Sequence, residues 1–160
     1  MIYKCVIKAF VYSTCHSKSR SSNRGSNSMG RPLVNIYVLD VTLETQVQHV
    51  FEEAAANFGR LDYVVSAAGV VSAMLGDMAS TPMEDWKRVL DTNLNGTLHV
   101  LRAAAHIMLR QSGPKRGSIV NITSVLSVRS MSNSAAYTTS KHAVIELTRS
   151  VAIDYLCEGA

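Results

Sequence analysis

The sequence predicts an α/β fold in which a parallel sheet is covered by helices. Three short apolar stretches with strand character alternate with longer stretches in which apolar residues recur at helical spacing. The second apolar stretch is almost continuous, which is typical of a parallel strand that is buried on both faces. The chain has 160 residues, of which 47% are hydrophobic, so we expect one domain with a substantial core.

The first 31 residues differ in composition from the rest of the chain. They are rich in Ser, Asn and Arg, and they hold six of the sixteen Lys and Arg residues but no Asp or Glu. Such a composition buries too little apolar surface to offset the entropy of ordering. We therefore expect an irregular or disordered, basic, Ser-rich head over residues 1–31 and a folded domain over residues 32–160. The domain has ten basic and twelve acidic residues, so we predict no nucleic-acid partner.

Residues 33–39 have the β-branched and aromatic composition of a strand, and Asp40 follows at its carboxyl end. Thr42 is a candidate cap for the next helix, which Gly59 is expected to end. The apolar residues of that helix fall on one face at helical spacing: Val47, Val50, Phe51, Ala54, Ala55 and Phe58. A strand followed by an amphipathic helix is the first unit of the predicted alternation.

The alternation then continues twice. Residues 61–67 form the second predicted strand, and a Thr-Pro pair at residues 81–82 marks the start of a helix whose spacing continues over residues 94–110. Residues 119–123 form the third predicted strand, and the last helix is predicted over residues 135–155. Helices of this length between the strands favour a parallel sheet with helices on both faces.

Ligands of such sheets bind beside the carboxyl ends of the strands. Asp40 follows the first predicted strand, residues 67–69 end the second, and Ser124 follows the third. These residues therefore point to one crevice at the carboxyl edge of the sheet.

Tyr137 and Lys141 are four residues apart on the last predicted helix, so they share one face. A free phenol has a pKa of about 10, and a cation within ~4–6 Å lowers that pKa by about one to three units. Tyr137 is thus a candidate acid or base near neutral pH, and Ser124 is a candidate hydrogen-bond donor to a substrate oxygen. Each pattern alone also fits a plainer interpretation: solvated helix residues at 137 and 141, a turn hydroxyl at Ser124 and a surface side chain at Asn93.

Together these residues carry a resemblance to the short-chain dehydrogenase/reductase family. The intervals also match, with thirty-one residues from Asn93 to Ser124, thirteen to Tyr137 and four more to Lys141. The similarity extends over residues 33–155. Five ordered motifs resemble those of the family: Asp40-Val41, Ser66-Ala67-Ala68-Gly69, Asn93-Leu94-x-Gly96, residues 119–124, and Tyr137-x-x-x-Lys141.

The resemblance implies a Rossmann-like, doubly wound parallel sheet and an oxidoreductase that interconverts a ketone and a secondary alcohol. It implies that Tyr137 donates the proton in reduction and accepts it in oxidation. Lys141 would lower the pKa of that tyrosine and hold the nicotinamide ribose. Ser124 would orient the substrate carbonyl, and Asn93 would fix a water that links Lys141 to solvent.

The implied cofactor is NAD or NADP, which supplies the hydride. Asp40 would contact its adenine, with Val41 beside it. Ala67, Ala68 and Gly69 would line the cofactor cleft. The partner would be a small-molecule carbonyl or alcohol substrate, and both the choice between NAD and NADP and the identity of the substrate stay open.

Two departures from the family pattern lead us to expect an incomplete fold, truncated at both ends. The family opens with a strand, a Thr-Gly-x-x-x-Gly-x-Gly turn, a helix and a second strand, whereas the thirty-nine residues before Asp40 contain no such turn. The chain also ends at Ala160, before the last strand and the substrate-closing segment. In addition, Ser66 and Ala67 stand where the family usually has two Asn residues, which removes hydrogen bonds that steady the central strands.

Three interpretations of function follow. The chain is an NAD(P)-dependent oxidoreductase, or a non-catalytic remnant that cannot hold the dinucleotide, or a regulatory or oligomerisation module. In the family, the helices that match residues 94–110 and 135–155 pack between subunits, so a homo-dimer or homo-tetramer is expected.

The remaining composition limits the setting. Cys5, Cys15 and Cys157 are odd in number and widely spaced, so they suggest neither a disulfide framework nor a metal site. We therefore expect a reduced, cytoplasmic location. No apolar run approaches the ~18 residues of a membrane span, so we predict no membrane association.

Overall fold

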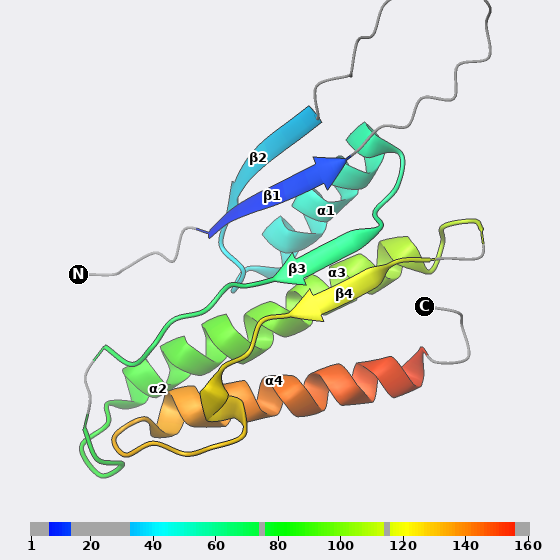
Figure 1. Ribbon diagram of the computed structural model, residues 1–160. Helices are drawn as coiled ribbons and strands as arrows, with labels where there is room; N and C mark the ends of the chain where they lie inside the picture. Colours follow the sequence, from blue (N-terminus) through cyan, green and yellow to red (C-terminus); the bar gives the residue numbers. More distant parts are fainter. Residues whose placement is uncertain (1–6, 14–32, 74–75, 114–115, 156–160) are drawn as a thin grey trace, which may run out of the picture.

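The computed structural model describes residues 7–13, 33–73, 76–113 and 116–155 (Figure 1). Strands and helices alternate along the chain, as expected. In order, the elements are β1 (Ile7–Ser13), β2 (Leu33–Leu39), α1 (Glu44–Phe58), β3 (Tyr63–Ser66), α2 (Met83–Leu90), the π-helix η1 (Asp91–Asn95), α3 (Gly96–Met108), β4 (Ser118–Asn121), the 3₁₀ turn η2 (Val125–Ser127) and α4 (Ala135–Asp154).

The strands form two pairs. β3 and β4 are parallel, with Tyr63 opposite Ser118 and Ser66 opposite Asn121. The chain passes between them through α2, η1 and α3, which is the long crossover that a parallel pair needs. β1 and β2 are antiparallel, with Ile7 opposite Leu39. The predicted α/β class and a partial parallel sheet are therefore confirmed for β3 and β4, whereas β2, which we expected in the same parallel sheet, forms a separate antiparallel pair with β1.

The helices of the described residues cover only one face of the strands, whereas we expected helices on both (Figure 1). On β3, Val64 and Ser66 are buried, but Tyr63 and Val65 are 82% and 62% exposed. On β4, Ile119 packs against the same hydrophobic core as Val64. The result is a layer of strands on a layer of helices, with an apolar strand face left open in the described part of the chain.

The expected irregular head over residues 1–31 is wrong for β1, which occupies Ile7–Ser13 and pairs with all of β2. The sequence of this strand, Ile-Lys-Ala-Phe-Val-Tyr-Ser, is rich in the β-branched and aromatic residues that strands favour, and β2 supplies the partner that a lone strand lacks. The rest of the predicted head, residues 1–6 and 14–31, lies outside the described residues.

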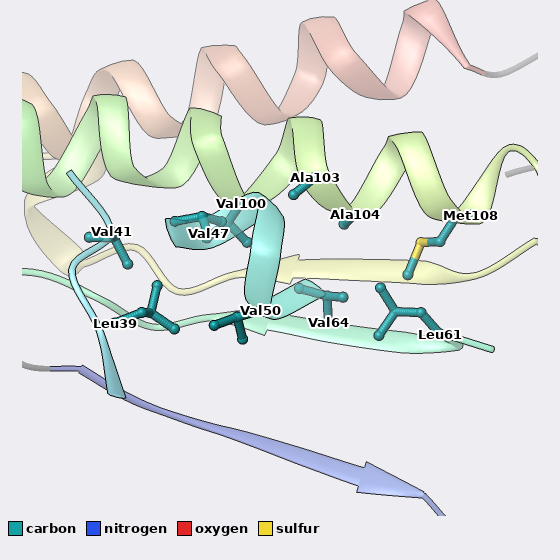
Figure 2. Packing of buried hydrophobic residues seen from close by; sticks show 10 residues of the cluster. All are labelled: Leu39, Val41, Val47, Val50, Leu61, Val64, Val100, Ala103, Ala104 and Met108. Atoms are coloured by element: carbon teal, nitrogen blue, oxygen red, sulfur yellow. The ribbon is translucent and has the colours of Figure 1, made fainter. Parts of the chain in front are cut away.

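The core lies between α1, α3 and the covered face of the strands, and Figure 2 shows its side chains converging there. Val47 of α1 and Ala104 of α3 are fully buried at its centre. The cluster comprises Leu39, Val41, Val47, Val50, Leu61, Val64, Val100, Ala103, Ala104 and Met108.

One glycine sets how closely α3 approaches β2. A Cβ added to Gly96 would lie 2.7 Å from Cγ2 of Val41, well inside van der Waals contact. Val41 is only 3% exposed, so it has little room to move. The absence of a side chain at Gly96 therefore places the end of β2 directly against the start of α3.

Helix ends agree with the sequence where a glycine ends them and differ at the predicted caps. Gly59 has φ 79°, and its N–H donates to Ala55 O at 2.8 Å, so it ends α1 as expected. Thr42 does not cap α1; its backbone N–H and hydroxyl both donate to Asp40 Oδ1. Thr81 does not cap α2, because Pro82 holds that position. No described helix is both long enough and apolar enough to cross a bilayer.

Candidate active site

Three segments meet at the carboxyl ends of β3 and β4: the loop that follows β3, the π-helix η1, and the first turns of α4. Gly69 comes from the first segment, Asn93 from the second, and Tyr137 and Lys141 from the third. Asn93 is hydrogen-bonded to Val70, which follows Gly69, and to Ser140, which precedes Lys141. Ser124 lies at the end of β4, two residues beyond the carbonyl that binds Lys141.

Lys141 is the buried cation of the site. It is 5% exposed, and its Nζ donates to Ile122 O at 3.1 Å. Nζ also lies 5.8 Å from the centre of the Tyr137 ring, so the predicted shared face is confirmed. Burial lowers the pKa of Lys141 below the ordinary lysine value, because it disfavours the charged form. An ammonium has three N–H donors, and Ile122 O is the only acceptor that the described residues give it.

Asn93 is fully buried, so the surface position that its sequence alone indicated is wrong. Its Oδ1 accepts from Val70 N at 2.8 Å, and its Nδ2 donates to Val70 O at 3.0 Å and to Ser140 Oγ at 2.9 Å. The orientation of the amide is fixed by these partners, since a backbone N–H must donate and a carbonyl must accept. Both Nδ2 protons are therefore used inside the protein.

Asn93 lies within a π-helix. η1 spans Asp91–Asn95 between α2 and α3, and it inserts extra backbone into a continuous helical stretch. Thr97 donates its hydroxyl to Asn93 O at 2.7 Å, which satisfies one of the carbonyls that the irregular turn frees. Asn93 lies four residues after Val89 and four before Thr97, both of which are buried, so regular helical spacing also places it on the covered face. Such single-turn π segments occur frequently at functional sites.

Gly69 brings an exposed stretch of backbone close to Asn93 and Lys141. A Cβ at this position would lie 3.3 Å from Asn93 Oδ1 and 3.5 Å from Lys141 Nζ. Gly69 itself is exposed, whereas Lys141 is buried. A bound molecule can therefore approach the ammonium over the backbone of Gly69, and any larger residue there would fill part of that approach.

Ser124 caps the η2 turn and still keeps a free donor. Its Oγ accepts from Leu126 N at 3.2 Å, and its backbone N–H donates to Ser127 Oγ at 3.0 Å. The turn-hydroxyl interpretation is thus confirmed for the oxygen. The hydroxyl proton of Ser124 has no acceptor among the described residues, so it is available to a bound oxygen atom.

Asp40 and Val41 directly follow β2, and their hydrogen bonds within the described part of the chain go to Gln46, Thr42, Leu43 and His99 and not to the Tyr137–Lys141 segment. Asp40 Oδ1 accepts both donors of Thr42, which leaves its Oδ2 free of partners among the described residues. The side chain of Val41 packs against Gly96, the first residue of α3, which lies three residues after Asn93. These two residues are therefore linked to the Asn93 segment by packing.

A second clamp holds the loop after β3, and sequence reasoning missed it. Asp85 of α2 accepts from Ala73 N at 3.2 Å and from Arg88, which also donates to Val71 O at 2.8 Å. Burial alone would raise the pKa of Asp85, but the hydrogen bonds from Arg88 and Ala73 hold it below its ordinary value. The only sequence signal for this clamp is the Asp-x-x-Arg spacing in the first turn of α2. Ordinary surface ion pairs have the same spacing, so the signal does not single out this pair.

Ser140 was missed as well. It is fully buried on α4, next to Lys141, and bonds Asn93 and Tyr137 O. Nearby, Ser66 Oγ and Asn121 Oδ1 are buried without partners at opposing positions of β3 and β4. No group of His, Cys, Asp and Glu in the described ranges is arranged to hold a metal.

Comparisons with known proteins give consistent matches. A family model described as Enoyl-(Acyl carrier protein) reductase matches residues 9–160. The chain is 36% identical over 132 residues to short-chain dehydrogenase fogB of Aspergillus ruber, covering 76% of this chain and 48% of that protein. It is 38% identical over 120 residues to a 3beta-hydroxysteroid dehydrogenase of Mediterraneibacter gnavus, covering 75% and 42%.

Solved structures show the same relationship. ElxO with NADP bound superposes with a TM-score of 0.71 at 35% identity, covering 77% of this chain and 48% of that one. NAD+-bound xylitol dehydrogenase gives a TM-score of 0.71 at 37% identity, covering 76% and 45%. The chain thus spans about half the length of the relatives that it matches.

Proposed function

This chain belongs to the short-chain dehydrogenase/reductase family, and on that premise we propose that it acts as an NAD(P)-dependent oxidoreductase that interconverts a ketone and a secondary alcohol. The observation that carries the proposal is the buried Lys141 ammonium, which lies over the ring of Tyr137 and beside the backbone of Gly69. Relatives named as a hydroxysteroid dehydrogenase and a xylitol dehydrogenase support a small-molecule alcohol or ketone as substrate.

In the reducing direction, Tyr137 donates its phenolic proton to the substrate carbonyl oxygen as negative charge develops there. Ser124 donates a hydrogen bond to the same oxygen, using the hydroxyl proton that has no internal acceptor. Lys141 stabilises the phenolate that Tyr137 leaves behind, because a cation in a buried site interacts strongly with a nearby negative charge. In oxidation, Tyr137 accepts the proton instead.

NAD or NADP fits the free groups of this site. The two uncommitted N–H donors of Lys141 suit the hydroxyls of the nicotinamide ribose, and Gly69 leaves the backbone open beside them. Ala67 and Ala68 continue that lining toward β3. The free Oδ2 of Asp40 suits the amino group of adenine, with Val41 packed behind it. When bound, the cofactor supplies the hydride.

Asn93 holds the loop after β3 in this proposal. A water that links Lys141 to solvent through Asn93 would have to bond the remaining acceptor capacity of Oδ1 or of the backbone O, since both Nδ2 protons are used.

A non-catalytic module is the second candidate, and the open apolar face of β3 and β4 favours it. Tyr63 and Val65 on β3, and Val120 on β4, are each at least half exposed. Apolar faces of this kind mark interaction surfaces. In either case we propose a homo-dimer or homo-tetramer formed through α3 and α4.

Titration of the purified chain with NADH and NADPH in a calorimeter separates the two candidates. The enzyme proposal predicts binding below millimolar concentration and turnover of small ketones. Tyr137→Phe should abolish turnover and leave cofactor affinity nearly intact. Tyr63→Phe is the matched control, because Tyr63 is exposed at the opposite end of β3. Absence of binding would sink the enzyme proposal, and full turnover by Tyr137→Phe would refute the role of that phenol.

A further inference from the structure

Ser140 occupies the junction between the segments of the site. It is fully buried on α4, one residue before Lys141 and three after Tyr137. Its Oγ lies 2.7 Å from Tyr137 O and 2.9 Å from Asn93 Nδ2.

The chemistry of the partners fixes the direction of both hydrogen bonds. Tyr137 O is a carbonyl and can only accept, so the single proton of Ser140 is directed to it. The lone pair of Ser140 Oγ is then left to accept from Asn93 Nδ2. Ser140 has no proton left for a ligand, so it does not contact substrate as a donor.

The bonds form a continuous chain across three segments. Asn93 accepts a hydrogen bond from Val70 N at 2.8 Å and donates one to Val70 O at 3.0 Å. It donates its second Nδ2 proton in a hydrogen bond to Ser140 Oγ. Ser140 in turn donates a hydrogen bond to Tyr137 O in the first turn of α4. Val70 directly follows Gly69, whose backbone faces Lys141 Nζ.

Replacement of Ser140 by Ala would break this chain at one point. The freed Nδ2 proton of Asn93 would be buried, with Asn93 itself fully excluded from solvent. An unmet buried donor is costly, so the Asn93 amide would rotate or shift toward another acceptor. Either movement weakens the hydrogen bonds between Asn93 and Val70, a residue to which Ser140 itself is not hydrogen-bonded among the described residues.

We propose that Ser140 is a positioning residue: through Asn93 it fixes the Gly69–Val70 backbone relative to Tyr137 and Lys141. Its effect on proton transfer rests on the proposed function, whereas the mechanical coupling from Ser140 to Val70 does not. The two claims are therefore tested by separate measurements.

Hydrogen exchange of the Val70 amide tests the coupling without any need for turnover. In Ser140→Ala, exchange at Val70 should be about tenfold faster or more, the size expected for one buried hydrogen bond left unmade. Ser140→Cys, which keeps the volume but bonds weakly, should behave in the same way. Ser150→Ala, an exposed serine on the same helix, is the matched control and should leave Val70 unchanged.

The amide of Val50 in the core of α1 reports on overall stability. If Ser140 merely fills space, exchange at Val50 and at Val70 will rise by equal factors, and that result overturns the proposal. If Ser140→Ala does not fold, the wild-type chain still decides: the Nδ2 protons of Asn93 should exchange slowly, and rapid exchange of both refutes the geometry.

Turnover addresses the catalytic consequence. The proposed coupling predicts that Ser140→Ala lowers kcat by about tenfold with little change in KM, and that Ser140→Thr, which keeps the hydroxyl, restores part of it. A changed Val70 amide in a chain without turnover would support the coupling and count against the proposed function. Unchanged exchange of the Val70 amide in a chain with turnover would support the proposed function and refute the coupling.

Discussion

The close approach of Gly96 to Val41 makes a testable demand on the packing between β2 and α3. In Gly96→Ala, the new Cβ would lie 2.7 Å from Val41 Cγ2 and 3.1 Å from Val41 Cβ. Carbon atoms pack best about 3.5–4.0 Å apart, so the overlap is on the order of 1 Å. Val41 is buried and β-branched, so rotation about χ1 does not relieve the overlap.

The magnitude follows from two opposing terms. Overpacking of a tight core site costs about 1–3 kcal/mol. Ala gains about 1 kcal/mol over Gly in a helix, which offsets part of that cost. The expected net loss in the free energy of unfolding for Gly96→Ala is therefore about 0–2 kcal/mol. Because the gain in helix propensity opposes the cost of overpacking, the single substitution does not separate the two effects, whereas a double substitution does.

Val41→Ala removes the Cγ2 atom that Gly96→Ala would strike at 2.7 Å, and it leaves the milder 3.1 Å approach to the Cβ atom. In the Val41→Ala background, the alanine at position 96 should therefore stabilise the chain by about 1 kcal/mol, through helix propensity alone. Urea unfolding of the four chains, followed by circular dichroism, gives the coupling energy, expected to be about 1–3 kcal/mol. A coupling near zero, or a Gly96→Ala chain that is more stable than the wild type, would show that α3 and β2 are not in this close contact.

Three further predictions concern the site. Burial lowers the pKa of Lys141 from 10.5, so the cost of burying its charge is relieved as pH rises. The unfolding free energy of the wild type relative to Lys141→Met should therefore increase from pH 7 toward pH 10. A difference that stays constant over this range would contradict the prediction. The pKa of Asp85 lies below 3.8, so its stabilisation is present above that pH and lost as pH falls through the lower folded value; acid titration of Asp85→Asn should lack this loss. Gly69→Ala should weaken NADH binding by about five- to a hundredfold, because its Cβ would lie 3.3 Å from Asn93 Oδ1 and would cover part of the approach to Lys141 Nζ; unchanged affinity in calorimetry would argue against cofactor at this position.

Sequence patterns predicted the elements whose signals are local. The bounds of β2 and the start of α4 agree with the expected residues 33–39 and 135, because composition and spacing within each segment mark them. β3 and β4 are shorter than expected, since their ladder pairs only four residues on each strand. Strand length depends on the partner, which a single segment does not contain.

The candidate site was predicted where resemblance supplied the long-range information. Residue type alone placed Asn93 on the surface, because asparagine is a mediocre helix former and is mostly exposed in proteins. The family motif placed Asn93 near Lys141, and the structure brings both to the same loop. Ser140 had no signal of either kind, since its importance depends on a partner forty-seven residues away.

The segment from Asn93 to Gly96 links the two ends of the proposed cofactor site by different forces. Asn93 holds Val70 and Ser140 through hydrogen bonds, which are directional and leave a buried cost when one partner is removed. Gly96 contacts Val41 by packing, which is non-directional and depends on volume, and a hydrogen bond between Val41 O and His99 Nδ1 at 2.9 Å adds to this contact. Removal of a hydroxyl at Ser140 should therefore alter the nicotinamide end and leave the adenine end intact, whereas added volume at Gly96 should do the opposite. Hydrogen exchange at Val70, and at Leu43, whose N–H donates to Asp40 O at 3.1 Å, measured in both variants, distinguishes this division from a site that loosens as one unit.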